Sequence, residues 1–180
     1  GGSCFPKDVK ALIHIGREHG VELQVLDAVE SANERQKHVL VDKVVARFGE
    51  DLAGRTFALW GLAFKPDTDD MREAPSRVVV DALLARGARV RAYDPVAADE
   101  ARRVLGDRPG LEFAASAADA AQGADALLLV TEWKEFRTPD FDGLKATLKQ
   151  PLVFDGRNIW DPALLAQMGF EYHGIGRAGG

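Results

Sequence analysis

The sequence has a single cysteine, Cys4, and no apolar run as long as a membrane span. One cysteine excludes an intramolecular disulfide, so a reducing, cytoplasmic setting is expected. A spanning helix would need about 20 consecutive apolar residues, and no secretory signal is visible. Internal repeats and low-complexity stretches are missing as well. These absences predict a globular protein that has no membrane partner.

An excess of positive charge is missing too. The formal net charge is -5, which argues against a general nucleic-acid binder. The length of 180 residues allows one full domain plus an appendage, and 46% hydrophobic with 28% charged residues is typical of a soluble globular protein. An anionic ligand would need local cations, and the candidates are Lys7, Lys65, Arg72 and Arg157.

The G-x-G-x-x-G fingerprint of dinucleotide-binding domains is also absent. In its place, residues 57–60 form a short apolar run typical of a buried strand, and Gly61 then opens a turn. A polar loop with Lys65 and Arg72 follows, and Pro75 is tolerated in the first turn of the next helix. This order favours an anion-binding loop beyond the end of a strand. The alternative is an ordinary strand-to-helix loop with two solvated cations.

The N-terminal residues place a thiol near a helix start. Pro6 is expected to be the first helical residue, so Cys4 should lie just ahead of the helix and beside Lys7. Both neighbours favour the thiolate. Asp8, expected in the first turn, could position a water near Cys4, and Gly1 lets a ligand approach the backbone. In the alternative interpretation Cys4 is a buried filler and Asp8 a simple helix-start residue.

Residues 23–48 contain no proline or glycine and follow a helical period, which predicts a long helix. Strand and helix patterns alternate from residue 57 onward, with the clearest buried strand at 126–131 and an edge strand expected at 170–175. The predicted fold class is α/β: a long connecting helix (within residues 1–48) followed by a Rossmann-like, mostly parallel doubly wound sheet (residues 49–180). The three tryptophans are expected in the core.

Two further polar positions follow predicted strands. Asp94 could contact a ribose, but the missing glycine fingerprint favours an Asp-Pro turn. Arg157 follows the strand at 152–154, at the sheet edge where ligands bind, and its guanidinium fork suits diphosphate or carbonyl oxygens. The alternative for Arg157 is a surface arginine after a turn.

Three stretches resemble one family. Motifs of the UDP-glucose 6-dehydrogenases, in the UDP-glucose/GDP-mannose dehydrogenase family, are similar to G-G-S-C-F-P-K-D at 1–8, G-L-A-F-K-P-D-T-D-D-M-R-E-A-P at 61–75 and D-G-R-N at 155–158. The resemblance implies NAD as cofactor, no metal, a UDP-glucose or UDP-glucuronate ligand, and a homodimer formed through the long helix. By the resemblance, the catalytic residues are Cys4 and Asp8, the substrate-binding residues Gly1, Phe64, Lys65 and Arg157, and the cofactor-binding residues Lys7 and Arg72.

The resemblance also implies a reaction. An alcohol is oxidised to an aldehyde, Cys4 adds to it, a second oxidation leaves a thioester, and water releases the carboxylate. The resemblance covers only the C-terminal portion of the family protein, without its NAD-binding domain, so the chain alone is expected to be inactive. Two alternatives stay open: a relative acting on GDP-mannose or a UDP-N-acetyl sugar, and a non-catalytic nucleotide-binding module.

Overall fold

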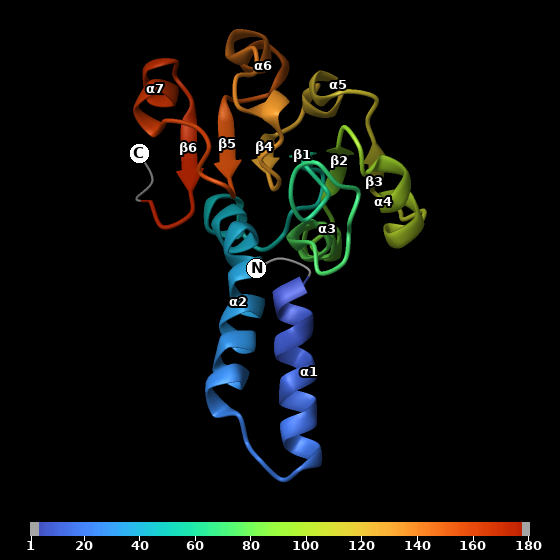
Figure 1. The fold of residues 1–180 in the computed structure, drawn as a ribbon. Helices are drawn as coiled ribbons and strands as arrows, with labels where there is room; N and C mark the ends of the chain where they lie inside the picture. The colour runs from blue at the N-terminus through green and yellow to red at the C-terminus, as the bar shows by residue number, and fades with distance from the viewer. Residues whose placement is uncertain (1–3, 178–180) are drawn as a thin grey trace.

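The computed structural model of the protein describes residues 4–177. Helices α1 (Cys4–Glu18) and α2 (Gln24–Phe48) form an antiparallel hairpin that extends away from the rest of the molecule (Figure 1). The hairpin buries Val9 and Ile13 of α1, whereas α2 is buried only toward its C-terminal end. The predicted long helix is therefore confirmed, and its last turns join the hairpin to the α/β part of the chain (residues 49–177).

The predicted start of the first helix at Pro6 is wrong. Helix α1 begins at Cys4, so Asp8 lies in the second turn rather than the first. Proline is accepted inside a first turn because the N–H groups there have no intrahelical partner. Pro6 thus did not mark the first helical residue.

Six strands form one sheet, and all of its pairings are parallel. The spatial order is β3-β2-β1-β4-β5-β6, which reverses direction between β1 and β4. The predicted doubly wound sheet is confirmed, including its edge strand β6. The strands are β1 (Thr56–Trp60), β2 (Arg89–Tyr93), β3 (Leu111–Phe113), β4 (Ala126–Leu129), β5 (Leu152–Asp155) and β6 (Glu171–Gly174).

Helices cover both faces of the sheet (Figure 1). Phe57 of β1 packs edge-on against Phe48 of α2, whereas the indole of Trp60, three residues later, donates to the Ala117 carbonyl of the opposite layer at 3.0 Å. Side chains three apart on a strand point to opposite faces. The helices are α3 (Pro75–Ala85), α4 (Ala98–Leu105), α5 (Ala117–Ala121), α6 (Phe141–Thr147) and α7 (Pro162–Gln167), with a 3-10 helix η1 (Lys134–Phe136) after β4.

The apolar runs of the sequence are buried in the core of the structure. Strand β4 is fully enclosed, as expected of a central parallel strand covered on both faces. All three tryptophans are in the core as predicted. The strand order reverses between β1 and β4, and open α/β sheets bind ligands beyond the carboxyl ends of the strands at such a point.

Candidate functional site

The loop after β1 lies directly against the segment after β4. Gly61 has φ 90°, and a Cβ at this position would lie 2.4 Å from the Thr131 Cβ and 2.5 Å from the Thr131 backbone nitrogen. The Thr131 hydroxyl donates to the Ala63 carbonyl. Only glycine permits this approach, so Gly61 brings the two loops together at the switch point of the sheet.

Asp94 holds the same loop from the other side. One carboxylate oxygen accepts from the amides of Leu62 (2.7 Å) and Ala63 (3.1 Å) and from the indole of Trp133 (3.0 Å). The other accepts from the amides of the turn residues Val96 (2.9 Å) and Ala97 (2.7 Å). Asp94 is 3% exposed. The preferred interpretation as an Asp-Pro turn is confirmed, because the carboxylate is buried and already accepts five N–H groups.

Arg157 connects three loops at the sheet edge. Its Nε donates to the Val130 carbonyl at 2.6 Å, and its Nη2 donates to the Phe64 carbonyl at 2.9 Å. Its backbone amide donates to the Asp155 carboxylate at 2.9 Å. The Glu132 carboxylate lies 3.1 Å from Nε as an ion pair. The alternative of a loose surface arginine is thus wrong.

Part of the Arg157 guanidinium is used within the protein, and its predicted contact with a diphosphate stays a prediction. Two of the three guanidinium nitrogens of Arg157 are used on backbone carbonyls, and no hydrogen bond among residues 4–177 uses Nη1. Arg157 therefore fixes the loop that contains Phe64 and Lys65, and it uses two of its five guanidinium N–H groups to do so.

The two remaining cations of this loop are both accessible. The Lys65 ammonium lies 5.4 Å from the centre of the Phe64 ring, close enough for a cation-π contact. The Arg72 guanidinium pairs with both oxygens of Asp70, at 3.0 and 2.8 Å, while its side chain stays 77% exposed. The structure thus brings Phe64, Lys65 and Arg157 together, with Arg72 farther along the same loop.

A cavity of about 150 Å³ lies next to Arg157. It separates the first turn of α1 from the carboxyl edge of the sheet, with α2 and the start of α3 as its side walls. The cavity is lined by Pro6 of α1, by Asn33, Gln36, Lys37 and Leu40 of α2, by Glu73, Pro75 and Val79 around the start of α3, and by Val130, Gly156, Arg157 and Ile175.

The predicted catalytic residues both belong to α1. Cys4 is the first residue of this helix, and Lys7 and Asp8 follow it by three and four residues. The Lys7 ammonium lies 3.7 Å from the Asp8 carboxylate, and both side chains are about 70% exposed. Gly1 and the side chain of Cys4 lie outside the described part of the structure.

Sequence reasoning missed an ion-pair network between the helical hairpin and the loop before α3. The Glu73 carboxylate accepts from Lys10 at 3.0 Å and from Lys37 at 2.8 Å. Lys37 also pairs with Glu34 at 2.7 Å, and Lys10 with Glu30 at 3.3 Å. Hydrogen bonds from Lys37 and then Lys10 lower the pKa of Glu73 to about 2. Because this pKa is depressed, the pairing stabilises the fold above the ordinary carboxyl pKa and is lost as the pH falls toward 2.

Within residues 4–177, no group of three or more His, Cys, Asp or Glu side chains is placed to hold a metal ion. No helix in that part of the chain combines the length and the apolar character needed to cross a membrane.

Comparison with known protein families shows which family the chain is related to. Residues 58–162 match the UDP-binding domain of the UDP-glucose/GDP-mannose dehydrogenase family, and residues 1–35 match the central domain of the same family. The chain belongs to the UDP-glucose/GDP-mannose dehydrogenase family. The resemblance inferred from the three sequence motifs is thereby confirmed.

Individual members of the family are similar along almost the whole chain. A UDP-glucose 6-dehydrogenase of Pseudomonas aeruginosa is 53% identical and one of Rhizobium meliloti is 45% identical, each over 98% of this chain. The solved UDP-glucose dehydrogenase of Pyrobaculum islandicum superposes with a TM-score of 0.82, at 35% identity over 99% of this chain and 38% of its own. The chain spans about 40% of the length of these curated dehydrogenases.

Proposed function

We propose that this chain is the portion of a UDP-glucose 6-dehydrogenase that binds the nucleotide sugar and carries the thiol nucleophile. One observation carries the proposal: Arg157 holds the Phe64 carbonyl of the loop after β1, and it lines the same cavity as Pro6, in the first turn of the helix that begins at Cys4. Residues 1–48 would supply the thiol, and residues 49–180 would hold the UDP sugar.

In this proposal the sheet edge binds the diphosphate and α1 performs the chemistry. Lys65 and the remaining Nη1 of Arg157 donate to diphosphate oxygens, which aims the sugar at the helix start. The substrate alcohol loses a proton and a hydride to give an aldehyde, to which the Cys4 thiolate adds. The resulting thiohemiacetal loses a second hydride to give a thioester. Water, positioned by Asp8, cleaves the thioester and releases the carboxylate and the thiol.

NAD would supply the hydride acceptor, with one NAD molecule used for each of the two oxidations. The exposed Lys7 and Arg72 fit such an anionic cofactor, because both offer accessible cations near the cavity end of α1 and on the loop before α3. Lys7 follows Cys4 by three residues of α1 and would hold the cofactor from the same helix.

Turnover tests the proposal directly. We expect no NADH from the 180-residue chain supplied with UDP-glucose and NAD, because it contains no glycine fingerprint for the dinucleotide. When the chain replaces the corresponding segment of the Pseudomonas aeruginosa relative, the chimera should produce NADH. Changing Cys4→Ala should abolish formation of the carboxylate product, which needs the thiol, whereas His14→Ala, an exposed position on the same helix, should not. NADH from the chain alone, or carboxylate product from the Cys4→Ala chimera, would contradict the proposal.

Arg157→Lys should weaken UDP binding about tenfold, or about 1.4 kcal/mol. A single ammonium cannot reach both the Val130 and the Phe64 carbonyls, so the loop that presents Lys65 loses its support. Isothermal titration with UDP measures the change. The matched control is Arg177→Lys, since Arg177 also donates to a backbone carbonyl, that of Trp160, away from the cavity. Equal affinities for wild type and Arg157→Lys would remove Arg157 from the site.

The helical hairpin is the proposed homodimer contact. It exposes a set of large apolar side chains that the described chain does not cover: Leu12, Ile15, Val21, Val25 and Val29. Apolar patches of this kind mark interaction surfaces. Sedimentation of the chain should show a dimer, and a Val25→Glu variant should shift it to a monomer. A wild-type chain that remains monomeric at high concentration would contradict this assignment.

A further inference from the structure

Glu73 connects three parts of the molecule. Its Oε1 accepts from Lys10 of α1 at 3.0 Å, and its Oε2 accepts from Lys37 of α2 at 2.8 Å. Glu73 itself lies in the loop between β1 and α3, which also contains Phe64 and Lys65. One carboxylate thus bridges both helices of the hairpin to the proposed sugar-binding loop.

The backbone of Glu73 is held in an unfavourable conformation. Its φ is 56°, in the left-handed region that costs a side chain other than Gly, Asn or Asp of order 1 kcal/mol or more. Such a conformation persists only where its surroundings enforce it. Here the two ion pairs hold the carboxylate, and the Lys37 side chain is only 9% exposed.

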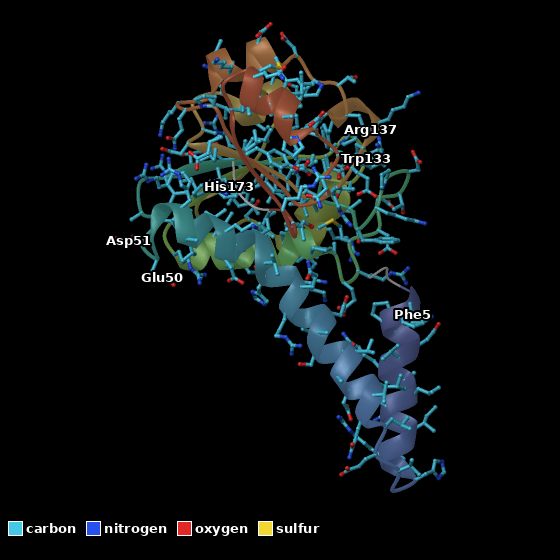
Figure 2. The ribbon with its side chains drawn as sticks, turned by 90° about the vertical axis from the view of Figure 1, so that its left-hand side faces the viewer. Phe5, Glu50, Asp51, Trp133, Arg137 and His173 are labelled. Carbon is cyan, nitrogen blue, oxygen red and sulfur yellow. The ribbon has the colours of Figure 1, made fainter. Side chains whose placement is uncertain are left out.

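The bridge from Lys10 differs from the other polar contacts of α1. It joins the side chain of Lys10 in α1 to the α/β part of the chain. The ion pairs of Lys7, His14 and Arg17, and that of Lys10 with Glu30, stay within the helical hairpin. Figure 2 shows Phe5 at the end of α1 nearest the sheet, while the helix extends away from it.

The bridge between Glu73 and Lys10 lies close to the thiol position along α1. Lys10 follows Cys4 by six residues, which is about 9 Å along a helix. Glu73, Pro6 and Arg157 line the same cavity. A change in the bridge would therefore move the start of α1 relative to the loop that Arg157 holds.

We propose that Glu73 is a positioning residue that docks the Cys4-bearing helix against the sugar-binding loop. Its carboxylate sets the separation of α1 from this loop by holding Lys10 and Lys37 at once. The consequence for catalysis rests on the proposed function above, whereas the docking of α1 does not.

The docking can be measured on the chain itself, because Cys4 is its only cysteine. A nitroxide attached to Cys4 should broaden the amide signals of residues 62–75 in the wild type. In Glu73→Gln this broadening should be lost. Glu30→Gln is the matched control, since it removes the other carboxylate beside Lys10 and leaves Glu73 in place. Broadening that is equal in wild type and Glu73→Gln would overturn the proposal.

A second variant covers the case in which Glu73→Gln fails to fold. Lys10→Gln changes a partly exposed side chain of α1 and leaves the Glu73 to Lys37 pair intact. It should lose the same broadening while the urea-unfolding midpoint of the α/β part stays unchanged. Retained broadening in Lys10→Gln would also overturn the proposal.

Kinetics of the chimera separate this proposal from the proposed function. Glu73→Gln should lower kcat for UDP-glucose and leave KM nearly unchanged, because the substrate contacts remain and only the thiol is displaced. An unchanged kcat despite lost broadening would refute the positioning role. If even the wild-type chimera fails to oxidise UDP-glucose, the proposed function fails, and the nitroxide result still decides the docking.

Discussion

Asp94→Ala should destabilise the α/β part by about 4–6 kcal/mol, because several buried donors each lose a partner worth about 1–3 kcal/mol. The five N–H groups come from two turns and one indole that together shape the loop after β1. Native domains have only about 5–15 kcal/mol of stability, so this variant should lie near the folding threshold. Urea unfolding followed by circular dichroism measures the loss.

Asp94→Asn serves as the milder companion variant. Its amide keeps one acceptor oxygen but directs an NH₂ group toward N–H donors, so we expect a smaller loss of about 2–3 kcal/mol. Asp99→Ala is the control, since Asp99 is 98% exposed and pairs only with its helix neighbour Arg102. A loss below about 1 kcal/mol for Asp94→Ala would show that Asp94 does not organise this loop.

Gly61→Ala should cost about 3–5 kcal/mol, since it combines a strained positive φ with an overpacked contact. The new Cβ would lie 2.5 Å from the Thr131 backbone nitrogen, and no rotation of a side chain can relieve a contact with backbone. The β1 and β4 loops would have to separate, so UDP binding should be lost together with stability. Urea unfolding and UDP titration of the same sample measure both effects.

Gly123→Ala isolates the conformational part of this effect. Gly123 also has a positive φ, 64°, but a Cβ added there would meet nothing within 4 Å. We expect this control to lose only about 1 kcal/mol and to keep its UDP affinity. Equal losses at the two glycines would mean that the close approach of Thr131 contributes nothing.

The fold could be predicted because its signals are local. The run of residues 126–129 is apolar at every position, as a central parallel strand requires, and α2 contains no helix breaker across its length. The one helix start that was placed wrongly, at Pro6, depended on a residue that several first-turn positions accept equally well.

The site was only partly predictable because its key contacts are distant in sequence. Arg157 was identified from its place after a strand, but the carbonyls that it binds lie 27 and 93 residues away. Glu73 was part of a recognised motif, yet its partner Lys37 is 36 residues away and appears in sequence as one of many helix lysines. No local pattern reveals that a carboxylate and an ammonium will meet across two elements.

The most direct test of the proposed nucleotide-sugar site is a titration of the isotope-labelled chain with UDP, followed by amide chemical shifts. We expect the chemical shifts to change at residues 61–75, at 130–132 and at 156–158. UDP should cause these changes at a lower concentration than GDP does. Changes confined to other surfaces, or no response to UDP at millimolar concentration, would contradict the assignment of the sheet edge as the nucleotide-sugar site.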